Sequence, residues 1–538
     1  MGIDSKHALG LNSSTQSITA VVVDLQAGAV VYRKSLDYAA DARLNHFGID
    51  ASEYIIPPKE PGEADQPPLM YLASIDALFH DMKSDGVDLS AIAVINSSAQ
   101  QHGHLYLNAE SAGLFARLKE PGSHEKNLVS LLKDGFSHST APIWKTSSTA
   151  TQAAEIRAGV GGSEKMIRLS GSDSPLRFTG AILRRMGRRF PNSYKDTETI
   201  QLISSFVPAV LTGHHRTPMD YGNGCGTSLM DYQRKTWSRE LAGATGAGLP
   251  GGGEGLLHKL PHLISPDSLV GAVALYFIDK YGFDRHCRVA AGSGDNPQTK
   301  VLIKDDLLSL GTSFVNMVST DGKTYDMDGY ANAMYDGLGR PFMFGCRTNG
   351  AMVWDRVRRM HGLGKNGFAP ADSALADSRA GRHIFIWQPD SESFPVSGQM
   401  KPTRIGYEKP NLKEDYCSIV DSSLGLVYLY SRGFTKQSHG PIAVTGGVSK
   451  NKEVLKRVAG IWNRPAYAIG TAGAALGAAL SGAVALAQSE GFPLDPESLS
   501  ASALPRGGWV EPRPEDVKAY HGAGNFLDRL KFEFEKLR

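Results

Sequence analysis

The sequence contains little cysteine, and the cysteines it has lie far apart. Cys225, Cys287, Cys346 and Cys417 are the four in 538 residues, and the closest two, Cys287 and Cys346, are 59 positions apart. This spacing excludes a C-x-x-C metal-ligand pair and a dense disulfide framework. We therefore expect reduced thiols, as in a cytoplasmic protein.

A surplus of charge is also missing. The 57 Lys and Arg residues nearly balance the 55 Asp and Glu residues, which leaves a formal charge of +2. Such a chain has no overall basic field to bind nucleic acid by releasing counterions, so we expect no nucleic-acid partner. The first residues, Met1 to Gly10, carry Asp4, Lys6 and His7 before any apolar run and lack the layout of a secretory signal. The expected location is cytoplasmic.

Long apolar runs are rare, and one segment needs a membrane check. Residues 466–488 contain no charge and include Gly473-x-x-x-Gly477, a spacing found in packed membrane helices. However, the segment is mostly alanine and glycine, whose transfer into lipid is poorly favourable. Small residues equally suit a helix that packs closely on a sheet. We predict a buried helix and no membrane span.

The remaining composition is that of a folded globular protein with more than one lobe. A chain of 538 residues is too long to fold around one hydrophobic core. Its 41% apolar and 21% charged residues are ordinary proportions for a folded protein. Strand patterns at 8–11, 18–24 and 30–36 predict an antiparallel meander. A helical pattern at 69–82 and a buried strand at 91–95 follow.

The second half repeats this alternation of strands and turns. Strands are predicted at 288–291, 306–310, 313–318 and 442–445, with a lobe boundary near 281–288. The glycine-rich residues 246–255 predict a surface loop, and residues 516–538 predict an amphipathic helix. The fold class is therefore α/β with at least two lobes.

Three turns of small residues each follow a predicted strand. They are Asn12-Ser-Ser-Thr15, Gly311-Thr-Ser313 and Thr445-Gly-Gly-Val-Ser449. Such turns expose backbone N–H groups and hydroxyls that can bind phosphate oxygens. Each alone also fits an ordinary connection between elements. Together, three such turns could hold one nucleotide.

Two polar turns carry side chains suited to catalysis. In Gly292-Ser-Gly-Asp-Asn-Pro297, Asp295 could be a general base for a hydroxyl that attacks phosphorus, and Asn296 could hold that substrate. The alternative is an acidic residue that caps a helix. In Gln100-Gln-His-Gly103, His102 could hydrogen-bond a polyol from a strand end, or serve the structure alone.

Several common motifs are missing. Gly362-Leu-Gly-Lys365 is no phosphate-binding P-loop, because Arg359 occupies the position of its first glycine and Asn366 replaces Ser or Thr. The sequence also lacks G-x-S-x-G, H-E-x-x-H and a Rossmann G-x-G-x-x-G after a strand. Hydrolase, zinc protease and dehydrogenase functions lose their usual support.

Taken in order, these motifs resemble the FGGY family of carbohydrate kinases, and within it the branch that acts on xylulose. The resemblance runs nearly end to end and rests on Gly10–Gln16, Gln100–Gly103, Pro142–Trp144 with Ser147–Thr149, Arg177–Gly180, Ser204–Phe206, Asp220–Tyr221 with Gly224–Gly226, Gly294–Asn296, Leu310–Ser313, Asn349–Gly350, and Thr445–Gly447 with Asn451.

The resemblance implies a two-lobed, actin-like (ribonuclease H-like) ATPase fold with a cleft between the lobes. It implies a sugar-binding lobe over 1–286, an ATP-binding lobe over 287–490 and a C-terminal extension over 491–538. It further implies ATP and Mg²⁺ as cofactors and phosphorylation of a ketose, D-xylulose giving D-xylulose 5-phosphate. The partners are then the sugar and ATP, and a homodimer is an open alternative for the assembly.

The family's roles can be carried over to matching positions. Asp295 would be the catalytic base, and the sugar would contact Gln101, His102, Asp173, Asp295 and Asn296. Nucleotide binding would fall to Ser14, Thr15, Gly311, Thr312, Gly446, Gly447 and Asn451. Phe368 could stack near adenine or be a core aromatic.

Three positions depart from the family pattern. Asn12 and Thr146 replace aspartates, and Asp173 replaces an arginine. An amide is a weaker partner for Mg²⁺ than a carboxylate, and a carboxylate cannot donate the hydrogen bonds of a guanidinium. A kinase for another ketose or polyol and a sugar- or nucleotide-binding pseudokinase therefore stay open, as does an ATPase without a sugar acceptor, which Gln100–Gly103 disfavours.

Overall fold

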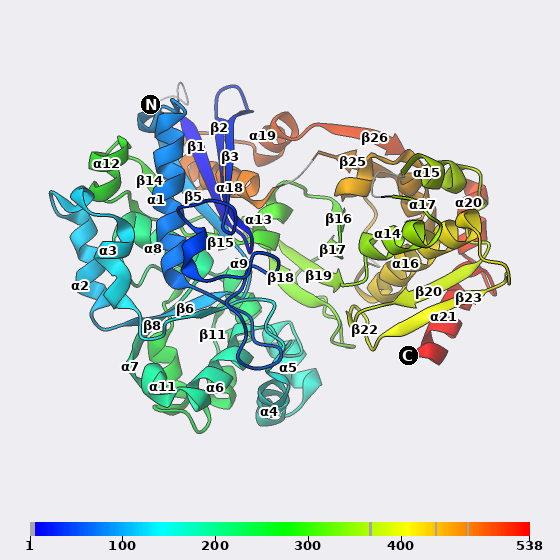
Figure 1. Ribbon diagram of the computed structural model, residues 1–538, viewed down its shortest axis with the longest axis horizontal. Coiled ribbons are helices and arrows are strands. Elements are labelled where there is room, and N and C mark those ends of the chain that lie inside the picture. Colours follow the sequence, from blue (N-terminus) through cyan, green and yellow to red (C-terminus); the bar gives the residue numbers. More distant parts are fainter. Residues whose placement is uncertain (1–5, 365–367, 436–437, 471–472) are drawn as a thin grey trace. The chain divides into compact units, whose positions relative to one another are not determined.

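The computed structural model describes residues 6–364, 368–435, 438–470 and 473–538. By packing, the chain divides into two compact units (Figure 1). Unit 1 comprises Met1–Leu302, Ala333–Pro341 and Gly473–Ala503, and unit 2 comprises Ile303–Asn332, Phe342–Ala472 and Leu504–Arg538. Each unit therefore consists of segments that are far apart in the sequence.

The sheet of unit 1 begins with the predicted meander. Strands β1 (His7–Ser13), β2 (Ser17–Asp24) and β3 (Ala29–Asp37) pair antiparallel in that order. On the other side of β1 lies β5 (Ile92–Ala99), which is parallel to it. Strands β14 (Arg288–Ala290) and β15 (Ser293–Gly294) both pair with β5 in parallel, and β13 (Leu269–Ala272) completes the edge beyond β14.

Helices cover both faces of this sheet. The face that carries Leu9 and Leu11 shares a hydrophobic core with α1 (Pro68–Ser84) and α8 (Ile203–Thr212). The other face packs on α18 (Ala474–Glu490), which contacts β1, β2 and β5. A Cβ atom at Gly10 would lie 1.8 Å from the carbonyl oxygen of Ala475, so glycine is required where β1 meets this helix.

The rest of unit 1 contains a second, smaller group of elements. Strand β6 (His104–Asn108) pairs antiparallel with β8 (Thr197–Leu202), and both share a core with α6 (Thr179–Arg189) and α7 (Pro191–Asp196). Helices α4 (Ala150–Val160) and α5 (Ser163–Ser170) pack with α6 in a separate small cluster. The surface loop predicted for 246–255 is wrong in part, because α10 (Arg239–Gly246) extends into it and α11 (Gly252–Lys259) begins within it. A Cβ at Gly253 would lie 2.7 Å from Cα of Gly243, so the glycines allow these helices to approach closely.

Unit 2 has its own sheet. Its order is β19 (Pro341–Arg347), β17 (Phe314–Ser319), β16 (Asp306–Leu310), β24 (Ile442–Thr445), β25 (Ala466–Ile469) and β26 (Arg506–Val510). Strands β16, β24 and β25 are parallel, and the other pairs are antiparallel. Helix α16 (Leu412–Thr435) packs against α14 (Ala351–Met360), α15 (Phe368–Ala376) and α17 (Lys452–Trp462).

The uncharged run at 466–488 divides between a strand and a helix. Its first residues form β25, and the helix begins only at Ala474, with Thr471 and Ala472 outside the described residues. Helix α18 is buried over most of its length, as predicted. Among the helices described for this chain, none combines the length and the apolar character that crossing a membrane requires.

Other predictions have mixed outcomes. All four cysteines are free, as expected. The single tail helix is wrong: the chain forms α20 (Pro514–Tyr520) and α21 (Phe526–Leu537), separated by Gly522 and Gly524 at φ values of 107° and 74°. Two predictions involve residues outside the described ones. The absence of a secretory signal was argued partly from residues 1–5, and the absence of a P-loop partly from Lys365 and Asn366.

Candidate active site

The C-terminal ends of three parallel strands in unit 1 lie at one edge of its sheet. Asn12 of β1 is in register with Ser98 of β5, and Gly294 of β15 is in register with Ala99. Neighbouring strands are about 4.8 Å apart, so the residues that follow these strand ends lie within one small region. The structure thereby brings together the Ser14–Thr15 turn, the Gln101–His102 turn and the Asp295–Asn296 pair.

Asp295 directly follows β15 and opens helix α13 (Asp295–Val301). Its Oδ1 accepts hydrogen bonds from the backbone N–H of Asn296 at 2.9 Å and from Nδ2 of that residue at 3.1 Å. Burial raises the pKa of the Asp295 carboxyl to about 6, although hydrogen bonds from the amides of Asn296 and Gln101 lower it in part. A carboxylate with this pKa can accept a proton near neutral pH.

Asn296 connects Asp295 to the turn after β5. Its Nδ2 also donates to Oε1 of Gln101 at 2.8 Å. The amide group of Gln101 is therefore oriented with its oxygen toward Asn296 and its nitrogen elsewhere. Three of the predicted sugar-site residues thus form one hydrogen-bonded group.

His102 is held in a single tautomer. Its Nδ1 lies 2.7 Å from the carbonyl oxygen of Gly226, which can only accept, so Nδ1 carries the proton. Burial lowers the pKa of His102 to about 3, and the positive charge of Arg177 adds to this effect. The neutral ring leaves Nε2 as an acceptor for a hydroxyl group.

The backbone and packing of His102 fix the direction of its ring. Its φ is 68°, a left-handed conformation that is uncommon for a residue with a side chain. The ring stacks on Phe178 with centroids 4.2 Å apart. A Cβ at Gly226 would lie 3.0 Å from a ring carbon of His102, which explains the glycine there.

A second carboxyl group lies behind the Asp295 turn, and sequence reasoning gave it no role. Asp220 ends β9 (Met219–Asp220), and its Oδ2 accepts from Oγ of Ser293 at 2.7 Å and from the amide of Asn223 at 3.1 Å. Burial raises the pKa of Asp220 to about 7. Its proximity to Ser293 arises from tertiary packing. The signal for it in the sequence was its place in the Asp220–Tyr221 motif of the family resemblance.

The residues of the first turn use their hydroxyls within the protein. Oγ1 of Thr15 donates to Oε1 of Gln100 at 3.1 Å and accepts from Nε1 of Trp144 at 2.8 Å. Oγ of Ser14 donates to the carbonyl of Ser17 at 2.9 Å. The backbone N–H groups of Ser14 and Gln16 also donate within the turn. Oδ1 of Asn12 is buried without a hydrogen-bond partner among the described residues.

Asp173 and Thr146 are engaged away from this group. Asp173 lies in the turn after α5, where Nη1 of Arg157 donates to its carbonyl at 3.1 Å and Nε lies 4.0 Å from Oδ1. Within the described residues, no hydrogen bond or ion pair joins Asp173 to His102 or Asp295. Oγ1 of Thr146 donates to the carbonyl of Ala64 at 3.2 Å. The substrate-binding role of Asp173 stays a prediction.

In unit 2, two glycine turns lie side by side. Ser309 of β16 is in parallel register with Thr445 of β24, so Gly311–Thr312 and Gly446–Gly447 follow adjacent strand ends. Gly446 has a φ of 100°, and a Cβ there would lie 2.4 Å from the carbonyl oxygen of Leu310. Only glycine fits at this position.

Asn451 lies at the N-cap of α17, just beyond these turns. Its Oδ1 accepts from the amide of Glu453 at 2.8 Å, and its Nδ2 donates to Oδ1 of Asp372 at 2.6 Å. Phe368 is 49% exposed, and the guanidinium carbon of Arg358 lies 3.9 Å from its ring centroid. The core-aromatic alternative for Phe368 is therefore wrong, because its ring lies at the surface.

Comparisons with known proteins bear on this arrangement. Residues 124–301 match the N-terminal domain of the FGGY family of carbohydrate kinases. "Probable D-xylulose kinase A" of Neosartorya fischeri is 28% identical over 496 residues, which cover 83% of this chain and 82% of that protein. Xylulose kinase of Mus musculus is 28% identical over 522 residues, covering 92% and 90%.

The fold is also found among solved structures. The crystal structure of xylulose kinase from Rhodospirillum rubrum superposes with a TM-score of 0.79 at 17% sequence identity, covering 99% of this chain and 98% of that one. The predicted α/β fold of the actin-like type is thereby confirmed. The matched domain and the curated relatives bear out the resemblance predicted from the motifs: residues 124–301 match the FGGY carbohydrate kinase domain, and the chain is similar over most of its length to proteins named as xylulose kinases.

Proposed function

We propose that the protein transfers the terminal phosphoryl group of ATP to a ketose, D-xylulose in the first instance, to give D-xylulose 5-phosphate. The observation that carries this proposal is the Asp295 carboxyl, which follows a parallel strand end, bonds to Asn296 and has a pKa raised to about 6. The names of the relatives, which describe xylulose kinases, support the choice of sugar.

In the proposed reaction, the terminal hydroxyl of the ketose attacks the γ-phosphorus of ATP. The hydroxyl proton passes to the Asp295 carboxylate, the new O–P bond forms, and the bond from phosphorus to the β–γ bridging oxygen breaks to release ADP. Burial of Asp295 keeps its basicity above that of an exposed aspartate, so it can take the proton as charge develops.

The other residues of unit 1 orient the sugar. Nε2 of the neutral His102 ring would accept a hydrogen bond from one ketose hydroxyl, and the amide groups of Gln101 and Asn296 would bind others. Gln101 and Asn296 are hydrogen-bonded to each other, and the His102 ring is held by Gly226, before substrate arrives. Such pre-organisation lowers the entropy lost when the reacting hydroxyl is positioned.

The nucleotide would bind through the glycine turns of unit 2. The Gly311–Thr312 turn offers backbone N–H groups to phosphate oxygens, and Gly446, Gly447 and Asn451 border the adenosine. Within the described residues, no group of three or more His, Cys, Asp or Glu side chains could hold a metal ion. Mg²⁺ would be held mainly by phosphate oxygens and water, and the unpartnered Oδ1 of Asn12 in unit 1 is an acceptor that fits a metal-bound water.

A second candidate is phosphorylation of another ketose or a polyol. Asp173 holds a carboxylate where the family's xylulose kinases are expected to have a guanidinium, and its contacts run to Arg157. Thr146 likewise offers a hydroxyl in place of a carboxylate, and that hydroxyl is bonded to Ala64. A site with different donors and acceptors selects a different pattern of hydroxyls.

The experiment is an assay of ATP consumption with a panel of ketoses and alditols. We expect turnover with D-xylulose or a related sugar, and a loss of at least a thousandfold in kcat for Asp295→Ala with an unchanged unfolding temperature. Binding of sugar or nucleotide without any turnover would favour a pseudokinase. Near-normal turnover of Asp295→Ala would exclude this residue as the base.

A further inference from the structure

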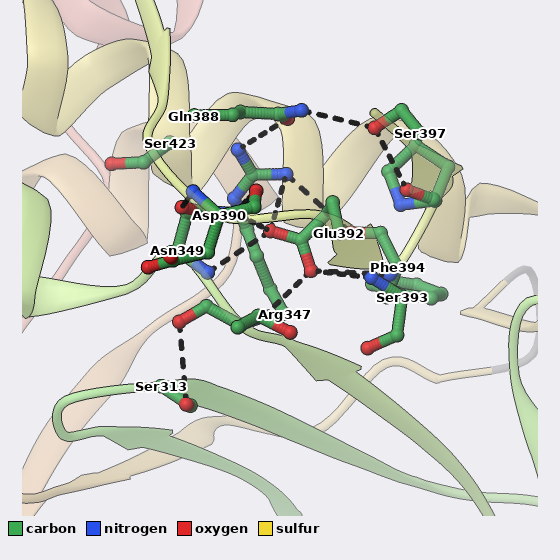
Figure 2. A network of polar contacts seen from close by, with 12 residues as sticks. Ser313, Arg347, Asn349, Gln388, Asp390, Glu392, Ser393, Phe394, Ser397 and Ser423 are labelled. Atoms are coloured by element: carbon green, nitrogen blue, oxygen red, sulfur yellow. Dashed lines mark hydrogen bonds and ion pairs between the residues drawn. The ribbon is translucent and has the colours of Figure 1, made fainter. Parts of the chain in front are cut away.

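A buried carboxylate in unit 2 holds the turn beneath the proposed phosphate loop. Glu392 lies in the short strand β21 (Glu392–Ser393), which pairs with β22 (Val396–Ser397). Its side chain has no exposed surface. Figure 2 shows this carboxylate at the centre of a polar network with Arg347 and Asn349.

The Glu392 carboxylate accepts an unusual number of N–H groups. Oε1 accepts from the amides of Thr348 at 2.6 Å, Ser393 at 2.8 Å and Phe394 at 3.3 Å. Oε2 accepts from the amide of Asn349 at 3.0 Å and from its Nδ2 at 2.9 Å. Charge-assisted hydrogen bonds of this kind are stronger than neutral ones, so Glu392 fixes the backbone at Thr348 and Asn349.

Arg347 supplies the opposite charge. Its Nη1 lies 3.7 Å from Oε2 of Glu392, its Nη2 donates to Oε1 of Gln388 at 3.1 Å, and Nη1 also donates to the carbonyl of Phe394 at 3.4 Å. Both ionic side chains are buried. A buried ion pair adds little to the free energy of unfolding, because the cost of desolvating both charges offsets their attraction. We therefore look for its role in the backbone geometry that it fixes.

The fixed turn lies directly against the Gly311–Ser313 loop. The amide of Ala351 donates to the carbonyl of Gly311 at 3.0 Å, and Oγ of Ser313 donates to the carbonyl of Thr348 at 3.3 Å. A Cβ at Gly350 would lie 2.7 Å from the carbonyl oxygen of Thr312. The turn and the loop therefore cannot shift independently.

These contacts determine where the loop's N–H groups point. The carbonyls of Gly311 and Thr312 accept from the first amides of α14, at Ala351 and Met352. In a trans peptide the C=O and the following N–H point in opposite directions. The N–H groups of Thr312 and Ser313 are thus directed away from α14, as donors to a phosphate would be.

We propose that Glu392 is a positioning residue for the nucleotide's phosphates, acting through the Thr348–Gly350 turn on the backbone amides of Thr312 and Ser313. This inference rests on the proposed function, since it takes the Gly311–Ser313 loop as the phosphate-binding element. Glu392 should therefore set the affinity for the nucleotide and leave the affinity for the sugar unchanged.

The test is steady-state kinetics with Glu392→Gln, which keeps the size of the side chain but removes its charge. We expect the KM for ATP to rise at least tenfold, while the KM for the ketose stays within twofold. Asn349→Ala removes one donor and keeps the carboxylate, so its KM for ATP should rise about threefold. This milder variant tests the proposal if Glu392→Gln does not fold.

Asp306→Asn is the matched control. Asp306 is a buried carboxylate at the opposite end of β16, where it accepts from Nη1 of Arg464 at 2.6 Å and from the amide of Ser319 at 2.9 Å. We expect it to lower the unfolding temperature as Glu392→Gln does, with the KM for ATP within twofold of wild type. An unchanged KM for ATP in folded Glu392→Gln, or an equal rise in Asp306→Asn, overturns the proposal.

Calorimetric titration with ADP separates this inference from the proposed function. If the wild type binds ADP but phosphorylates no sugar, the proposed function fails. The positioning role then still predicts at least a tenfold weaker Kd for ADP in Glu392→Gln and an unchanged Kd in Asp306→Asn. A wild-type chain that binds no ADP overturns both proposals.

Discussion

Asp220 is a buried carboxyl group and Asp295 a partly buried one, and the fold gives them different partners. Asp295 bonds to Asn296 at the open end of the strands, whereas Asp220 accepts from Ser293 behind the same turn. Burial raises the pKa of Asp295 to about 6 and that of Asp220 to about 7. Only Asp295 is proposed to meet the substrate.

This difference predicts a pH dependence of turnover. A general base works only when it is deprotonated, so kcat/KM should be constant above pH 6 and fall about tenfold per unit below it. Asp220→Asn removes the other titrating carboxyl and should keep the break near pH 6. A kcat/KM that stays flat down to pH 5 in both proteins would contradict Asp295 as the base.

Sequence reasoning found the residues that follow strand ends and missed those held by tertiary packing. Gln101, His102 and Asp295 could be singled out because each closely follows a predicted strand, and in the structure the strands β5 and β15 run parallel and end at one edge. Asp220 and Glu392 do not follow such a strand toward this edge. Tertiary packing brings Asp220 to Ser293 and Glu392 to Thr348, and these contacts could not be predicted from the sequence. The alternative, that Asp295 caps a helix, is met only in part: α13 begins at Asp295, but its N-cap residue is Gly294 and no side chain caps it.

At the scale of elements, the close packing of α18 in unit 1 depends on glycine. A Cβ at Gly477 of α18 would lie 1.7 Å from the carbonyl oxygen of Gln298 in α13, and a Cβ at Gly10 of β1 would lie 1.8 Å from the carbonyl oxygen of Ala475 in α18. The small-residue composition of the run at 466–488 predicted such packing. It could not separate β25 from α18, because short apolar runs do not distinguish strand from helix.

The packing predicts that Gly10→Ala is strongly destabilising. The added methyl would overlap the backbone of Ala475, and overpacking of a rigid contact costs about 1–3 kcal/mol or more in the free energy of unfolding. Gly473→Ala is the control, because a Cβ there meets nothing within 4 Å. Chemical denaturation measures both, and an equal effect of the two variants would show that the close approach is not limiting.

At the scale of the whole molecule, unit 1 is assembled from distant segments. The predicted division at residue 286 treats the lobes as continuous stretches, and the binding roles given to them stay a prediction. By packing, unit 1 includes α13 and also takes α18 from the far end of the chain. Composition and periodicity could not reveal this, because they report local structure and not which segments share a core.

This assembly predicts that residues 1–302 do not fold alone. Without residues 473–503, the sheet face around Gly10 would be uncovered and its apolar residues exposed to water. We expect the 1–302 fragment to aggregate or to bind a hydrophobic dye. Fusing 473–503 to it through a flexible linker should restore a cooperative unfolding transition. A fragment that unfolds cooperatively without the added segment would show that α18 is dispensable.

The late position of α18 also bears on synthesis of the protein. A chain emerging from the ribosome N-terminus first exposes β1, β2 and β5 long before Gly473–Ala503 has been translated. At about 5–20 residues per second, the first unit would wait tens of seconds for the helix that covers its sheet. During that interval the nascent polypeptide would present an open face suited to a chaperone, and a premature stop ahead of residue 473 would leave neither unit complete.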